Sequence, residues 1–314
     1  MHRTRTTLRA LAVAATLAIG LAACGGGEGT GTGAGGTGND PAAGGGDKGA
    51  IKVGAYDFPE GRLLAQIYAA ALNKAGYSAS VLQLQQRNTV QPALQKGDVD
   101  VVPDYVSSLL NFYQPNSATS DDAANVAKLK QLAEAKGVVV YTPTPATDNY
   151  AYVVSKKFSE DNDIKTVSEL AAYSQQKPID FGGTPECREN PICKVGLEQK
   201  YGMKFGEYKT IVLSSQAAAD GLLKDDYQAA VFNSSDGVLA VNEVVVLEDD
   251  KGLNPNDNIV PTVNKGKATS DLETALNAIS AKITQEELLR MNKETQNDRK
   301  AIDKVAQEFV DNNS

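Results

Sequence analysis

Strand-like and helix-like segments alternate along this chain from Ile51 onward, and this alternation restricts the fold more than any other feature of the sequence. Residues 51–55 form a short apolar run typical of a buried strand, and apolar residues at helical spacing follow from Leu63 to Ala75. The same succession repeats over residues 79–102. Repeated strand and helix units predict an α/β fold and favour parallel strand pairing.

Two breaks divide this pattern into two α/β regions. The Thr-Pro-Thr-Pro segment at 142–145 interrupts regular structure, and we interpret it as a crossing between domains. A second α/β region begins at Tyr150, includes a strand at 211–213, and ends at a return crossing near residues 244–247. The prediction is therefore two lobes, with residues 51–142 plus 244–314 in lobe 1 and residues 143–243 in lobe 2. Such lobes leave a cleft that can close over a ligand.

The first 23 residues have the layout of a lipoprotein signal peptide. Three arginines precede an apolar run that is too short to span a membrane permanently, and the run ends in Leu21-Ala22-Ala23-Cys24. Small residues before a cysteine resemble the lipobox of bacterial lipoproteins, so Cys24 is the expected lipid anchor. An ordinary secretory signal with a chance cysteine is the alternative. Residues 24–50 are rich in glycine and predict a flexible tether, which would hold the folded part outside the cell membrane.

Charge and histidine content exclude several classes of function. The net charge is −8, so nucleic acid is not an expected partner. The single histidine, His2, lies in the expected signal, which leaves no imidazole for a catalytic triad or a metal site. We therefore expect no enzyme activity, no cofactor and no metal. An exported hydrolase that works through carboxylates, such as a glycosidase, remains the alternative.

The two remaining cysteines, Cys187 and Cys193, lie six positions apart. In an exported protein such a pair predicts a structural disulfide. A redox pair would be closer in sequence, and a metal site would need more ligands.

Several short motifs resemble the glycine betaine/choline-binding proteins of quaternary-amine ABC transporters, the OpuAC-type substrate-binding family. The resemblance runs from Ile51 to about Asn312. It rests on residues 53–60 (VGAYDFPE), 93–100 (ALQKGDVD), 103–105 (PDY), 201–205 (YGMKF), 234–237 (SSDG), 246–252 (VLEDDKG) and 283–287 (ITQEE). It implies a two-lobed periplasmic-binding-protein fold of type II and an ABC permease as partner. We also expect the protein to be a monomer.

The resemblance also implies a site. Members of this family enclose a trimethylammonium group in aromatic rings, because ring faces attract a cation that has no N–H donors. Tyr105 and Tyr150 match two tyrosines of this box, and Ser108 matches a hydroxyl that helps to hold the polar end of the ligand.

Three positions depart from the family pattern. Asn233 and Asp257 stand where the family has aromatic residues, and Asn190 stands where many members have an arginine that pairs with a carboxylate, although Arg188 could substitute. Polar groups at these positions suit a ligand with N–H or O–H donors. We therefore expect a small cationic or polar solute, with glycine betaine or choline still among the candidates.

Overall fold

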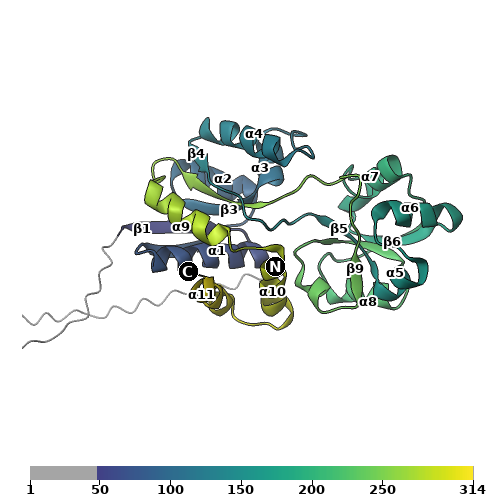
Figure 1. Cartoon of the computed structure of the whole chain (residues 1–314). Helices are drawn as coiled ribbons and strands as arrows, with labels where there is room; N and C mark the ends of the chain where they lie inside the picture. The colour runs from purple at the N-terminus through teal and green to yellow at the C-terminus, as the bar shows by residue number, and fades with distance from the viewer. Residues whose placement is uncertain (1–47, 314) are drawn as a thin grey trace, which may run out of the picture. The chain divides into compact units, whose positions relative to one another are not determined.

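The computed structural model describes residues 48–313 (Figure 1). The expected signal peptide, Cys24 and nearly all of the expected tether lie outside these residues. Within residues 48–313, no helix is both long and apolar enough to cross a membrane.

The first of two five-stranded sheets combines strands from both ends of the described chain. Its strands, in spatial order, are β2 (Ser78–Gln83), β1 (Ala50–Ala55), β3 (Val101–Tyr105), β10 (Ile259–Asn264) and β4 (Val138–Val140). Its helices are α1 (Pro59–Lys74), α2 (Arg87–Lys96), α3 (Val106–Tyr113), α4 (Asp122–Glu134), α9 (Ser270–Ser280), α10 (Gln285–Asn292), the π-helical η4 (Lys293–Asn297) and α11 (Ile302–Asn313). We call this part lobe 1.

Helices cover both faces of this sheet. Neighbouring residues of a strand point to opposite faces, and Val101 and Val102 accordingly belong to two different apolar cores. One core includes α1, α9, α10 and α11, and the other includes α2, α3 and α4. Because both faces of the sheet are buried, its central strands contain mostly apolar residues.

The second sheet has the same layout. Its order is β7 (Phe205–Thr210), β6 (Ile179–Gly183), β8 (Ala229–Asn233), β5 (Tyr150–Ser155) and β9 (Val244–Val246). Its helices are α5 (Lys156–Asn162), α6 (Val167–Gln176), η1 (Glu186–Arg188), α7 (Lys194–Gly196), the π-helical η2 (Leu197–Tyr201), α8 (Gln216–Leu223) and η3 (Gly237–Ala240). This part is lobe 2. A capping box formed by Thr166 and Glu169 starts α6.

The structure corrects the expected return crossing. Residues 244–246 do not leave the second sheet, because they form β9 and pair with β5. The chain crosses back over residues 247–258, beside the first crossing at 141–149, and Thr147 and Asn258 form a β-bridge between the two. Pairing is also mixed, since β5 and β10, the first strands after each crossing, are antiparallel to their neighbours.

Residues 211–213 are not a strand, because the edge strand β7 ends at Thr210. The preceding segment supplies the pairing instead, with Phe205 opposite Ile179 of β6.

The turn after β8 packs on the C-terminal helices. Gln285 and Asn292 of α10 donate hydrogen bonds to the backbone oxygens of Ser234 and Ser235 at 3.0 and 2.8 Å. A Cβ atom on Gly237 would lie 2.4 Å from the backbone nitrogen of Lys293, so this contact requires glycine. Lobe 2 therefore meets lobe 1 through backbone contacts as well as through the crossings.

Candidate functional site

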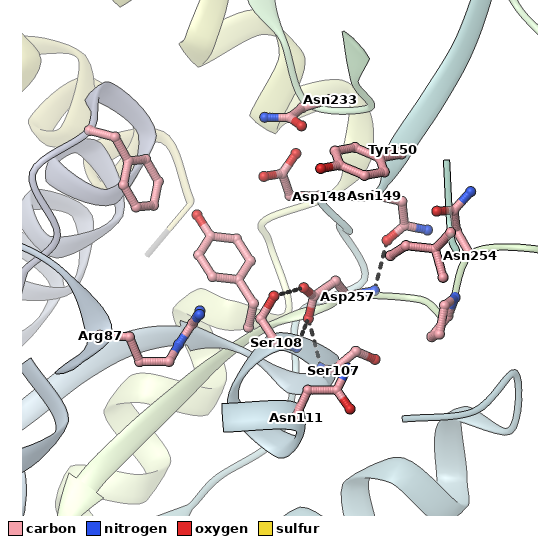
Figure 2. A pocket seen from close by; sticks show the side chains of 14 residues that line it. Arg87, Ser107, Ser108, Asn111, Asp148, Asn149, Tyr150, Asn233, Asn254 and Asp257 are labelled. Atoms are coloured by element: carbon pink, nitrogen blue, oxygen red, sulfur yellow. Dashed lines mark hydrogen bonds between the residues drawn. The ribbon is translucent and has the colours of Figure 1, made fainter. Parts of the chain in front are cut away.

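A cavity of about 320 Å³ lies where elements of both lobes and both crossings meet (Figure 2). Its lining comprises three rings, several amides and hydroxyls, two carboxylates and one guanidinium. The lining residues are Phe58, Arg87, Tyr105, Ser107, Ser108, Asn111, Asp148, Asn149, Tyr150, Ile192, Asn233, Asn254, Pro255 and Asp257. Its volume is in the range of sites for small molecules.

The three rings come from separate elements. Phe58 is the N-cap residue of α1, Tyr105 ends β3 and Tyr150 begins β5. The centroids of Phe58 and Tyr105 lie 6.3 Å apart, and Phe58 also stacks on Tyr56 at 5.7 Å. Pro59 at the first helical position fixes the backbone next to Phe58. The cavity thus has aromatic walls on lobe 1 and lobe 2.

A buried carboxylate fixes the ring of Tyr105 from outside the cavity. Glu60 is 4% exposed and accepts the Tyr105 hydroxyl at 2.6 Å on one oxygen and the Asn292 side chain at 2.6 Å on the other. Burial and the neighbouring Glu60 carboxylate raise the pKa of Tyr105 well above its usual value. The Tyr105 hydroxyl therefore stays protonated and acts as a donor.

Arg87, which supplies the guanidinium group of the lining, forms an ion pair with a second buried carboxylate. Its Nε and Nη2 atoms donate to one oxygen of Asp104 at 3.1 and 2.8 Å. The other Asp104 oxygen accepts Gln91 at 2.7 Å and the Tyr56 hydroxyl. Asp104 has no exposed surface. The positive charge at this wall of the cavity is therefore largely neutralised.

Asp257 occupies the N-terminus of α3. Its Oδ1 accepts the backbone N–H groups of Ser107 and Ser108 at 2.7 and 3.1 Å, and its Oδ2 accepts the Ser108 hydroxyl at 2.5 Å (Figure 2). The helix dipole favours an anion at this place. Burial nevertheless raises the pKa of Asp257 to about 6, against the lowering effect of these hydrogen bonds and of Arg87.

Asp148 places negative charge on the other side of the cavity, near Tyr150 and Asn233 (Figure 2). It accepts the Ser235 hydroxyl at 2.7 Å. Burial and the Glu60 carboxylate raise its pKa well above the usual range. A cation in the cavity would relieve this repulsion between carboxylates.

The structure brings together most of the residues predicted from the sequence. Tyr105, Tyr150, Ser108, Asn233 and Asp257 all line the cavity. Asn190 is not part of the lining, although its side chain is a hydrogen-bond partner of Tyr150 and its Oδ1 accepts the backbone N–H of Ile192 at 3.0 Å.

The predicted disulfide is confirmed and holds the loop that carries Asn190 and Ile192. Cys187 and Cys193 are bonded, with their Cα atoms 5.2 Å apart. Arg188 does not replace a carboxylate-binding arginine, because it lies over the ring of Tyr208, 4.4 Å from the centroid, and outside the cavity lining.

Sequence reasoning missed Phe58, Arg87 and Asp148. Phe58 belongs to the 53–60 motif, and Asp148 precedes Tyr150 by two positions. The sequence signal for these two residues was a ring and a carboxylate close to residues that were expected in the aromatic box. Arg87 had no such signal.

A second cavity of about 760 Å³ adjoins the first and shares Phe58, Asp148 and Asn233 with it. Its lining adds the acids Glu60 and Asp236, and one base, Arg62. The pKa of Asp236 is raised to about 6, chiefly by burial. Carboxylates therefore outnumber cationic side chains throughout this region.

Two sheets covered by helices, joined by two crossings and enclosing a ring-lined acidic cavity, define a two-lobed solute-binding protein of the α/β class. The family model for the substrate-binding domain of ABC-type glycine betaine transport systems, OpuAC, matches residues 49–312, and the chain belongs to this family. Substrate-binding proteins of ABC importers act outside the cytoplasm, so this chain is extracytoplasmic.

Individual relatives cover nearly the whole chain at low identity. A glycine-betaine-binding protein of Pseudomonas aeruginosa is 26% identical over 278 residues, covering 86% of this chain and 89% of the relative. A carnitine transport binding protein, OpuCC, of Listeria monocytogenes is 23% identical and covers 87% and 90%. A crystal structure of a glycine betaine/carnitine/choline ABC transporter protein, 21% identical, superposes with a TM-score of 0.76 over 83% of this chain and 98% of the other. This last similarity supports the fold.

Proposed function

We propose that this chain captures a small quaternary ammonium solute in the cavity between its lobes and delivers it to an ABC permease. The observation that carries the proposal is the convergence of Phe58, Tyr105 and Tyr150 on a cavity that also contains Asp148. Ring faces and an uncompensated carboxylate both attract a cation that offers no N–H donors. The family and the names of its relatives support the same ligand class.

Phe58 partly restores the aromatic surroundings that a trimethylammonium group requires. Asn233 and Asp257 stand where the family has two aromatic rings, so the cavity lacks those rings. Phe58 adds a ring at a position that is not among the expected box residues. Asn233 still lines the cavity and is suited to a ligand with an O–H group. The proposed ligands are therefore trimethylammonium compounds, with a hydroxylated one well matched.

Calorimetric titration of the mature chain tests this proposal. We expect saturable binding of at least one of choline, glycine betaine and carnitine, and much weaker binding of ammonium and of primary amines of similar size. Preference for primary amines over every trimethylammonium compound would contradict an aromatic box. Measurable turnover of a glycoside would instead revive the hydrolase alternative, which neither the family nor the relatives support.

We also propose that Cys24 is acylated and anchors the protein to the cell membrane, with the glycine-rich segment as tether. The support is the sequence of the N-terminal segment and the extracytoplasmic work of the family. Cys24→Ala should move the protein from the membrane fraction to the soluble fraction without changing solute affinity. Unchanged membrane association of this variant would refute the anchor.

A further inference from the structure

We propose that Asp257 makes this cavity selective for quaternary ammonium solutes that carry no carboxylate. The inference rests on the proposed function and specifies its ligand class. Choline, with a hydroxyl at its polar end, belongs to the favoured class, and glycine betaine, with a carboxylate, does not.

The groups around Asp257 form an anion-binding site at the start of α3. The Asp257 carboxylate itself occupies this site. Two backbone N–H groups and one hydroxyl of Ser107 and Ser108 donate to it. The Asp257 backbone N–H is held in turn by Asn149 at 2.7 Å, and the Ser107 hydroxyl donates to the backbone oxygen of Asn256 at 2.6 Å. The position of Asp257 is thus fixed by the first turn of α3 and by the first crossing.

A ligand carboxylate at the N-terminus of α3 would need these same donors. The first N–H groups of a helix are the natural partners of an anionic group, and here Asp257 takes two of them together with the Ser108 hydroxyl. A second carboxylate beside Asp257 would add repulsion between like charges in a poorly hydrated place.

The cationic side chains of the described residues offer little net positive charge to a ligand carboxylate in this cavity. Arg87 is the basic residue among those that line this cavity, and two of its nitrogens already donate to Asp104. Arg188 lies over the ring of Tyr208. Asp148 lines the opposite part of the cavity. A hydroxyl group, in contrast, can donate to the Asp257 carboxylate without adding charge.

The decisive experiment compares choline chloride and glycine betaine by calorimetric titration at pH 7.5, on the wild-type mature chain and on Asp257→Asn. We expect the wild-type protein to bind choline at least about tenfold more tightly than glycine betaine, and Asp257→Asn to reduce this ratio at least about threefold. Asp303→Asn, which removes an exposed acid outside the cavity, should leave the ratio unchanged.

Each outcome has a separate meaning. Equal or tighter binding of glycine betaine by the wild-type protein overturns the inference and leaves the proposed function intact. Binding of neither compound overturns the inference, and the absence of carnitine binding as well overturns the proposed function. If Asp257→Asn fails to fold, Asp257→Glu provides the second test, because it keeps the charge and should keep the preference for choline. A wild-type preference that Asp257→Asn leaves unchanged would assign the selectivity to another residue and overturn the role of Asp257.

Discussion

Phe58 is the most exposed of the three rings that line the cavity, at 38%, whereas Tyr105 is 5% exposed. We predict that Phe58→Ala weakens binding of a trimethylammonium solute by about 0.5–2 kcal/mol, the usual contribution of a cation–π contact. Calorimetric titration measures this loss. Phe58→Tyr should retain most of the affinity because it keeps the ring.

Phe112→Ala is the matched control for this prediction. Phe112 is also a partly exposed ring, at 43%, but it is not part of the cavity lining. Its removal should change affinity little. Equal losses for Phe58→Ala and Phe112→Ala would show that the effect of Phe58 is not a ligand contact.

Under the proposed function, the Asp148 carboxylate favours cation binding and lowers the stability of the ligand-free protein. Its carboxylate lies near that of Glu60, which disfavours the charged form in the empty cavity. We predict that Asp148→Asn raises the free energy of unfolding of the ligand-free protein on the order of 1 kcal/mol at pH 7.5 and weakens cation binding about tenfold. Urea unfolding and calorimetry would measure the two effects. Lower stability together with unchanged affinity would contradict this assignment.

The residues of the candidate site could be predicted only where a local motif contained them. Tyr105 and Tyr150 follow from short sequence patterns, and both line the cavity. The hydrogen bond between Tyr105 and Glu60 joins residues 45 positions apart, and the bonds of Asp257 to α3 span about 150. No periodicity or motif contains such long-range contacts, which is why the bonds of Asp257 to Ser107 and Ser108 could not be predicted.

At the scale of elements, the disulfide holds the loop between η1 and α7 against the cavity. Ile192 lines the cavity, and its backbone oxygen accepts the Tyr152 hydroxyl at 3.0 Å. We predict that replacing both Cys187 and Cys193 by serine lowers the free energy of unfolding by about 2 kcal/mol, as expected for a short cross-linked loop. Solute affinity should fall as well, because the loop loses its fixed position.

Thermal unfolding and calorimetry of this double variant, with the wild-type protein kept oxidised, check both effects. The wild-type protein under reducing conditions is the internal control and should behave like the variant. A variant as stable as the oxidised wild-type protein would show that the loop is held by its other contacts alone.

The turn after β8 offers a second test at this scale. A Cβ atom at position 237 would meet backbone atoms of Asn292 and Lys293 at 2.4–2.6 Å, which no side-chain motion can relieve. We predict that Gly237→Ala destabilises the protein by about 1–3 kcal/mol, as overpacking usually does. Gly266→Ala is the control, since a Cβ atom there meets only the tip of the Asn264 side chain, at 3.1 Å. Equal unfolding midpoints for the two variants would contradict a tight contact between the lobes.

The elements with a strong local signal were predicted well, and the misses share one physical cause. The first strand and the first helix, β1 and α1, lie where the sequence predicts them. The valines of β9 were assigned to a crossing because nothing local distinguishes an edge strand from an extended connection. The antiparallel direction of β5 and β10 likewise depends on the route of the chain between sheets.

For the whole molecule, the excess of acids in and around the cavity links solute binding to pH. Asp257 and Asp236 have pKa values raised to about 6, and the pKa of Asp148 is raised as well. Between the ordinary carboxyl pKa and about 6, these three carboxyl groups therefore hold more protons in the folded ligand-free protein than in the unfolded chain. These groups stabilise the fold below pH 4, and their contribution is lost as the pH rises through about 6.

A bound cationic solute lowers the pKa values of these carboxyl groups, because it favours their charged forms. Arg87, which faces Asp257 from α2, already favours its charged form but does not return its pKa to the ordinary value. We predict that choline binds about tenfold more weakly at pH 5 than at pH 8, and that binding at pH 5.5 releases protons, seen as a dependence of the calorimetric enthalpy on the buffer. Asp257→Asn should flatten the pH profile, whereas Asp303→Asn should not. An affinity that stays constant from pH 5 to pH 8 would mean that the solute does not contact the titrating carboxylates, and that the aromatic rings alone account for its retention.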